Sequence, residues 1–204
     1  NRAIEEIPKI REEFWNDIID DSPSYFLGPV IINTEHSEDP TDPYLEVVDG
    51  QQRLITATIL SAVIRDVYKS FSDNTKADKI QEHFIAKQDL NGHDIGFRLT
   101  PGKSLKEFFK NYIQKESDDH NIGEIEGSTK EHKLIINNYK DLKNRLNSYF
   151  QNADTNENKI NKIGDIRDRL VKLTVIKISI SNNSDAYEIF ERTNNYGVEL
   201  SISD

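Results

Sequence analysis

The chain has 204 residues, but it contains no cysteine and no methionine. The absence of cysteine excludes disulfide bonds, thiolate metal sites and thiol catalysis. No apolar run approaches the roughly 18 residues that a membrane-spanning helix requires, and the first residues lack the pattern of a signal peptide. We therefore expect a cytoplasmic protein with no membrane partner. Since the chain starts at Asn1 and lacks methionine, we also expect a fragment of a longer protein.

Basic residues are fewer than acidic residues in this chain. The chain carries 36 acidic residues against 26 basic ones, for a net charge of −10. A broad, sequence-independent nucleic-acid surface needs a basic face, so this balance argues against one and leaves room only for a local basic pocket.

The histidines show no spacing typical of metal ligands. They fall mostly in polar stretches, so we interpret them as solvated surface residues. Residues 118–121, DDHN, resemble part of an HNH nuclease motif, but no zinc-ββα context surrounds them and a loop is favoured. The histidines are His36, His83, His93, His120 and His132.

Asp42 and Glu46 suggest the acidic pair of a metal-dependent nuclease. Nuclease chemistry of that type needs a lysine two residues after the glutamate, where this chain has Val48. Because side chains alternate along a strand, Glu46 and Val48 share a face and no lysine stands there. The pattern therefore argues against DNA cleavage at this position.

Strand patterns occur early and late in the chain. Residues 25–33 and 44–48 are rich in β-formers and are joined by an acidic loop, which predicts a hairpin. Gly28-Pro29 suggests a bulge or an edge position in the first of these strands. Residues 173–181 alternate in character and predict a further strand. We expect residues 25–33, 44–48 and 174–180 to share one sheet.

Helical periodicity fills most of the remaining sequence. The broad apolar face of the 51–71 segment predicts a helix buried on more than one side and packed on the sheet. Ser104 is the expected N-cap of one middle helix, and 97–102 is expected to form a short strand and turn. The helical segments are 3–20, 51–71, 75–86, 104–115, 131–150, 163–172 and 184–194.

These patterns predict an α+β fold with a small sheet built from both ends of the chain. We expect a single domain over residues 1–204, with a core at approximately 20–72 and 173–204. Residues 73–172 would form a helical insertion in that core.

Residues 47–60, VVDGQQRLITATIL, begin with the pattern of a strand and end with that of a helix. A strand that turns directly into a helix exposes free backbone N–H groups, and the helix dipole adds partial positive charge there. Such a junction binds anions, phosphate above all. Gly50 lets a ligand approach the backbone, and Arg53 offers a planar fork to phosphate oxygens. Gln51 and Gln52 offer neutral donors.

Asp49 is open to several interpretations. Its carboxylate could bind Mg²⁺, orient a water molecule, or cap the helix. In a purely structural interpretation of the turn, Asp49 caps the helix, Gly50 permits the tight turn and Arg53 pairs with an acid.

Two blocks of the chain resemble the N-terminal DGQQR-motif domain of the GmrSD-type modification-dependent restriction endonuclease family. The first block is residues 47–60. The second is residues 185–204, DAYEIFERTNNYGVELSISD, and the matching order runs from Tyr25 to Asp204. The resemblance implies a ParB/sulfiredoxin-like fold with a small mixed sheet, in which a strand–glycine–x–x–arginine–helix junction binds nucleotide phosphates.

The resemblance also implies site residues. Gly50, Gln51, Gln52 and Arg53 match the phosphate-binding junction. Arg192 and Asn194 are expected to complete the pocket from the second block. Asp49, Arg53 and Asp204 are candidate catalytic residues, with Asp49 as a candidate Mg²⁺ ligand.

The leading hypothesis is a nucleotide-binding, and potentially nucleotide-hydrolysing, regulatory domain of a phage-defence restriction protein. Its cofactors would be a nucleoside triphosphate and Mg²⁺. Its partners would be modified DNA, reached through the full-length protein, and a C-terminal or separate nuclease module. One alternative is a non-catalytic DNA- or protein-binding module of the same system, and another is a nuclease domain in its own right.

Overall fold

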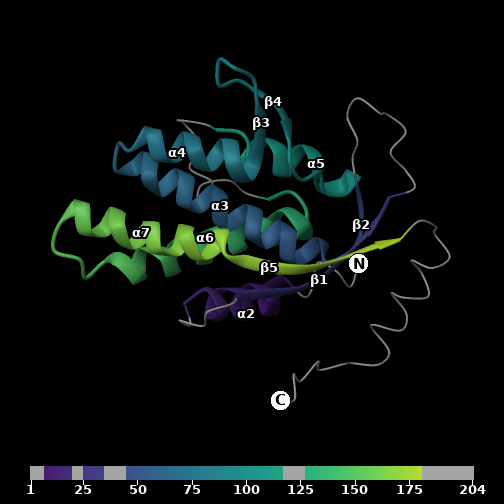
Figure 1. Ribbon diagram of the computed structural model, residues 1–204, viewed down its shortest axis with the longest axis horizontal. Helices are drawn as coiled ribbons and strands as arrows, with labels where there is room; N and C mark the ends of the chain where they lie inside the picture. The colour runs from purple at the N-terminus through teal and green to yellow at the C-terminus, as the bar shows by residue number, and fades with distance from the viewer. Residues whose placement is uncertain (1–6, 20–24, 35–44, 117–126, 181–204) are drawn as a thin grey trace. The chain divides into compact units, whose positions relative to one another are not determined.

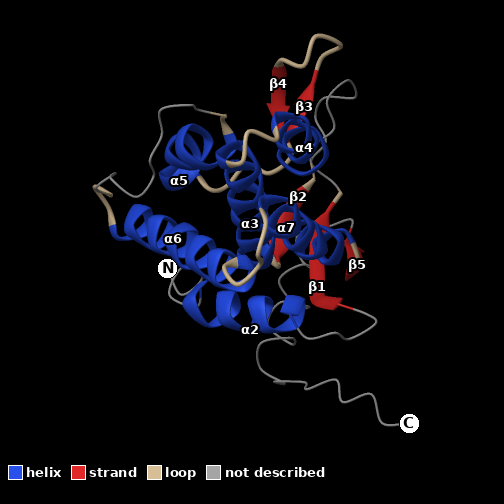
Figure 2. Ribbon diagram, turned by 90° about the vertical axis from the view of Figure 1, so that its left-hand side faces the viewer, coloured by secondary structure: helices blue, strands red, loops and turns tan. Residues whose placement is uncertain are grey.

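The computed structural model describes residues 7–19, 25–34, 45–116 and 127–180. It combines helices with a three-stranded and a two-stranded sheet, which confirms the predicted α+β class (Figures 1 and 2).

The chain divides into two compact units. The helical unit comprises residues 1–25 and 52–173, and the sheet unit comprises residues 26–51 and 174–204. The expected single domain, with its core and insertion, stays a prediction, as does the ParB/sulfiredoxin likeness.

The sheet unit is built on β1 (Tyr25–Asn33), β2 (Glu46–Asp49) and β5 (Leu173–Ile180). These strands form one sheet in the order β2-β1-β5, which confirms the prediction that the early and late strands share a sheet. β1 and β2 pair antiparallel, as the predicted hairpin requires. The packing of the 51–71 helix on this sheet stays a prediction.

β1 is the middle strand of this sheet, so the edge position suggested by Gly28-Pro29 is wrong. Pro29 lies before the residues of β1 that pair with β2, which run from Ile31 to Asn33, so its missing N–H does not interrupt that pairing. The irregularity lies between Ile31 and Ile32, where the register shifts. Gly28 itself has a φ of +101°, a conformation that favours glycine.

The sheet unit has a small apolar core. Ile31 and Ile180 are buried, and Val48 and Ile178 pack against them half-buried. The backbone N–H and the side-chain hydroxyl of Thr34 both donate to the Ile180 carbonyl, at 3.0 and 3.1 Å. These bonds fasten the end of β1 to the end of β5.

The helical unit centres on α3 (Gln51–Ser70), whose buried positions surround the helix. The prediction of burial on more than one side is therefore confirmed. Ile59, Leu60 and Ile64 are completely buried, and so is Tyr68 near the far end. Burial on several sides places α3 in the interior of its unit.

Three further helices pack together in this unit: α2 (Ile7–Ile19), α6 (Lys130–Phe150) and α7 (Asn156–Val171). The Arg169 guanidinium donates to the carbonyls of Ile18 and Ile19, at 3.0 and 2.7 Å. A cation at these carbonyls satisfies the C-terminal end of α2.

α7 begins seven residues before the helix expected at residue 163. Its N-cap is Thr155, whose hydroxyl accepts a hydrogen bond from the Asn158 N–H at 3.1 Å. Residues 151–159 are polar, and the helical pattern starts only at residue 163, but a threonine cap lets a polar first turn join the helix.

A hairpin of β3 (Ala86–Gln88) and β4 (Asp94–Phe97) extends from the helices of this unit (Figures 1 and 2). The strand expected at 97–102 was therefore placed too late, and β3 was missed. The available signal was the Asn91-Gly92 pair, since Gly92 has the positive φ, +83°, that tight hairpin turns require.

The hairpin is flanked by helices that each end in a π-helical turn. α4 (Asn74–Ile80) continues as η1 (Gln81–Ile85), and α5 (Lys103–Phe109) continues as η2 (Lys110–Gln114). The expected N-cap at Ser104 is wrong, because α5 starts one residue earlier and Gly102 takes the cap position.

A buried arginine joins these π-helical turns to α3. The Arg65 Nη1 donates to Gln81 Oε1 at 2.8 Å and to the Gln114 carbonyl at 3.2 Å. The Gln81 side-chain amide also donates to the Gln114 carbonyl, at 2.9 Å. All three residues are at most 2% exposed, so this network replaces water as the partner of the buried charge.

Candidate functional site

The predicted strand-to-helix junction is present. β2 ends at Asp49 and α3 begins at Gln51, so Gly50 alone connects them. Gly50 is buried and has a φ of +92°. A Cβ at this position would lie 3.0 Å from Val30 Cγ2 and 3.2 Å from the Pro29 carbonyl oxygen. Glycine is favoured here because the φ is positive and because β1 passes directly against the turn.

The first turn of α3 contains no acidic side chain. Its free N–H groups and the positive end of the helix dipole are therefore not neutralised from within the helix. The junction retains the electrostatic character that favours an anion.

The Asp49 carboxylate makes no hydrogen bond or ion pair with any residue that the structure describes, although the residue is half-buried. Since α3 starts at Gln51, the position before the helix falls on Gly50 rather than on Asp49. The capping role in the structural interpretation therefore finds no support in the geometry.

The next three residues, Gln51, Gln52 and Arg53, differ in the contacts that their side chains make. The Gln51 Nε2 donates to the Val47 carbonyl at 2.7 Å, so this amide partly serves to hold the turn against β2. The Oε1 atom of Gln52 is buried and has no hydrogen-bond partner in the described part of the chain. Arg53 is half-buried and already has a partner in the folded chain.

The second predicted block lies outside the described residues. Arg192, Asn194 and Asp204 all belong to it, so their meeting with the DGQQR turn stays a prediction. Among the residues from 7 to 180 that the structure describes, no cluster of three or more histidines and acids has a geometry suited to a metal ion. Over the same residues, every helix is too short or too polar to span a bilayer.

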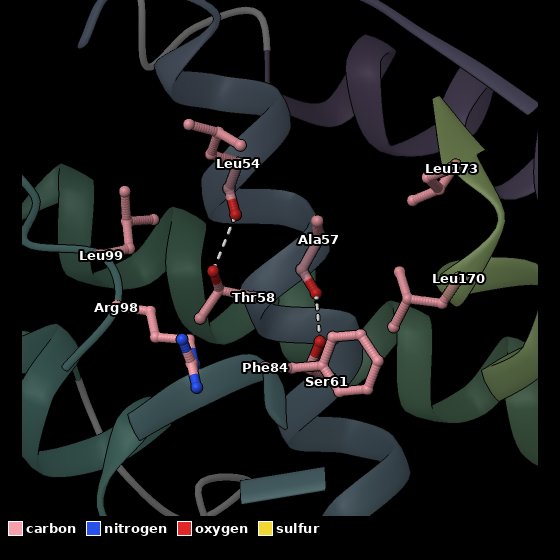
Figure 3. A pocket seen from close by; sticks show the side chains of 9 residues that line it. All are labelled: Leu54, Ala57, Thr58, Ser61, Phe84, Arg98, Leu99, Leu170 and Leu173. Atoms are coloured by element: carbon pink, nitrogen blue, oxygen red, sulfur yellow. Dashed lines mark hydrogen bonds between the residues drawn. The ribbon is translucent and has the colours of Figure 1, made fainter. Parts of the chain in front are cut away.

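A groove that the sequence analysis missed runs along α3 immediately after the motif (Figure 3). Its volume is about 240 Å³. Its floor is one face of the helix, and the remaining residues stand around that face. We call it the α3 groove; it is lined by Leu54, Ala57, Thr58, Ser61, Phe84, Arg98, Leu99, Leu170 and Leu173.

The available signal for the floor was the spacing 54, 57, 58 and 61, which places these residues on one helix face. The walls come from distant segments, and no local pattern marks them. Two floor hydroxyls donate to their own helix: Thr58 to the Leu54 carbonyl at 2.8 Å and Ser61 to the Ala57 carbonyl at 2.9 Å.

The described residues form an α+β structure in which a strand, one glycine and a helix follow one another directly along the chain. The family model described as "GmrSD restriction endonuclease, N-terminal domain" matches residues 8–204. The chain belongs to this family, and the resemblance seen in the sequence is confirmed. The family connects the domain with a restriction system that acts on DNA. A search of curated proteins returns no match.

Proposed function

We propose that the turn from Asp49 to Arg53 binds the phosphates of a nucleoside triphosphate. The observation that carries this proposal is the junction itself. Gly50 holds a φ of +92° between a strand and a helix whose first turn has no acid. Phosphate binds at such helix N-termini through backbone N–H groups and the helix dipole.

Each residue of the turn has a distinct role. Gly50 sets the path that presents the N–H groups, and the backbone N–H groups of Gln51 and Gln52 donate to phosphate oxygens. Arg53 adds a charge-assisted, planar contact. Arg192 and Asn194 complete the pocket from the second block.

The Asp49 carboxylate suits Mg²⁺ because no described residue engages it and it adjoins the proposed phosphate position. Mg²⁺ is commonly held by one or two carboxylates together with phosphate oxygens and water. When bound, the ion would neutralise phosphate charge. If hydrolysis occurs, Asp49, Arg53 and Asp204 act by positioning and electrostatic stabilisation, without a covalent intermediate.

In the whole protein, nucleotide occupancy of this domain would regulate DNA restriction in phage defence. The family assignment supports the connection with a restriction system. The partners are a nuclease module, in the same chain or in another, and modified DNA that the full-length protein recognises.

The first prediction tests the phosphate site. Arg53→Ala should weaken nucleoside triphosphate binding about ten- to a hundred-fold, because a hydrogen bond to a charged group contributes roughly 1.5–3 kcal/mol. Arg53→Lys should restore part of this, since lysine offers a point charge and no planar fork. Calorimetric titration of each variant, beside a thermal melt, measures both affinity and stability.

Arg145→Ala is the matched control, because Arg145 is a half-buried arginine that pairs with Asp141 on α6, at 2.6 Å. It should leave nucleotide affinity unchanged. Asp49→Asn should keep the fold and lower metal-dependent turnover. If Arg53→Ala lowers the melting temperature and leaves the affinity unchanged, the structural interpretation of the turn holds.

One observation favours a second candidate function, a protein-binding module. Leu90 and Ile95 lie on the β3–β4 hairpin, and they are 106% and 68% exposed. Exposed apolar side chains on an extended hairpin are suited to contact with a protein partner. Removing both side chains, by Leu90→Ser with Ile95→Ser, should disrupt association with the nuclease module in a pull-down if this function holds.

A further inference from the structure

We propose that the α3 groove receives the nucleobase of the nucleotide whose phosphates bind at the start of α3. This inference rests on the proposed function. It assigns the base of the nucleotide to the α3 groove, which is separate from the proposed phosphate site. The groove is an observed feature of the helical unit, and its residues lie outside the DGQQR motif.

The groove and the last residues of the motif are neighbours on α3. Leu54 lines the groove and directly follows Arg53, and both residues belong to the helical unit. At a rise of roughly 1.5 Å per residue, Leu54 lies about 5 Å along the axis from the first residue of α3. A ligand anchored by its phosphates at the helix start can therefore extend along this face.

The volume of the groove selects a ring system rather than a whole nucleotide. It measures about 240 Å³. An engineered cavity of roughly 150 Å³ holds benzene, whereas sites for drug-sized ligands occupy roughly 300–1,000 Å³. A one- or two-ring base matches the observed space, and the sugar and phosphates would remain outside it.

The lining is suited to the faces of a base. Leu99 stands on one side of the α3 floor, Leu170 and Leu173 stand on the other, and Phe84 lies near Ser61 (Figure 3). Ala57 of the floor has a small side chain, so a flat group can lie close to the helix at this position. Apolar and aromatic surfaces of this kind hold planar rings.

The polar groups of the groove are suited to the edges of a base. The hydroxyl hydrogens of Thr58 and Ser61 go to helix carbonyls, which leaves oxygen lone pairs as acceptors. Arg98 uses one guanidinium nitrogen to donate to the Glu82 carbonyl at 2.8 Å and retains further donors. Nucleobases carry both donors and acceptors at their edges, so this set can engage either.

The experiment compares nucleoside triphosphates with inorganic triphosphate, which has the phosphates and no base. Calorimetric titration of the whole chain should show the better nucleotides binding roughly ten- to a hundred-fold tighter than inorganic triphosphate, the range expected for base stacking. Ala57→Leu fills the floor of the groove. It should reduce nucleotide affinity to the level of inorganic triphosphate and leave the affinity for inorganic triphosphate unchanged.

Ala153→Leu is the matched control, because Ala153 is also half-buried. It lies just before the N-terminus of α7, whereas Leu170 of the groove lies near the C-terminus of that helix. It should leave both affinities unchanged. Arg98→Ala is a second test at an exposed position, where loss of the fold is not expected. It should lower nucleotide affinity alone.

The outcomes separate the two proposals. If nucleotides bind no tighter than inorganic triphosphate, or if Ala57→Leu and Arg98→Ala leave nucleotide affinity unchanged, the base pocket is overturned while the phosphate site stands. If neither inorganic triphosphate nor any nucleotide binds, the phosphate site fails and the base pocket fails with it.

Discussion

Gly50 determines how the chain passes from β2 into α3. Its positive φ is accessible to glycine without the strain that other residues incur. Its neighbours on β1 also leave little space for a Cβ, since Val30 Cγ2 would lie 3.0 Å away and would have to shift. Two independent constraints therefore act on one residue, and both protect the geometry of the proposed phosphate site.

Gly50→Ala should consequently destabilise the fold more than Gly92→Ala. Gly92 has a similar φ of +83°, but a Cβ there meets nothing within 4 Å. A left-handed alanine costs roughly 1–2 kcal/mol in both variants, and overpacking against β1 should add about 1 kcal/mol or more for Gly50. Chemical denaturation measures the two free energies of unfolding. Equal losses would mean that β1 does not constrain the turn.

At the level of secondary-structure elements, α3 and α6 are joined by a polar contact in an apolar setting. The Tyr139 hydroxyl of α6 donates to Asp66 Oδ2 at 2.7 Å. The other oxygen of Asp66 accepts from Arg65 Nε, also at 2.7 Å. Burial raises the pKa of Tyr139 above its ordinary value, and the neighbouring Asp66 carboxylate raises it further.

This pKa shift predicts a loss of stability at alkaline pH. A tyrosine whose pKa is higher in the folded state stabilises the fold fully below the ordinary value of 10.0, and the contribution falls as the pH rises above it. The pKa of Tyr68 is also raised by burial, so both residues contribute. Tyr139→Phe should cost roughly 1.5–3 kcal/mol at neutral pH, and it should reduce the loss above pH 10.

Urea unfolding from neutral pH to about pH 11 checks this prediction. Tyr149→Phe is the control on the same helix, since no described residue forms a hydrogen bond with the Tyr149 hydroxyl. It should stay close to wild type at neutral pH. An alkaline profile of Tyr139→Phe that matches wild type would contradict the role assigned to the Tyr139–Asp66 contact.

For the whole molecule, the decisive property is the charge balance. A net charge of −10 opposes association with the phosphate backbone of DNA. The family nonetheless connects the domain with a DNA restriction system. These two facts agree if DNA is recognised by another part of the full-length protein while this domain binds nucleotide.

The chain alone should therefore bind unmodified duplex DNA more weakly than about 10⁻⁴ M at physiological salt, the weak end of non-specific binding. Fluorescence anisotropy with a labelled duplex, at low and physiological salt, measures this affinity. Tight binding that falls steeply with salt would instead support a DNA-binding module, the alternative that the composition disfavours.

The sequence by itself determined the elements whose patterns are local and the family to which the chain belongs. Alternation in residues 173–181 marked β5, and spacing along 131–150 marked α6, because each pattern depends only on near neighbours. The pentapeptide from Asp49 to Arg53 marked the junction in the same way, since a strand, a glycine and a helix follow one another directly. The sequence pattern places the start of α7 too late, at residue 163. The helix starts earlier because the Thr155 hydroxyl caps a first turn that is polar.

Only the tertiary structure decided which distant residues meet. The constraint on Gly50 comes from Val30, which lies on another strand. The partners of Arg65 come from two π-helical turns, and the α3 groove brings Leu170 beside Leu54. Such contacts depend on the packing of whole elements, whose free energy is spread over many apolar side chains and leaves no mark on any one stretch of sequence.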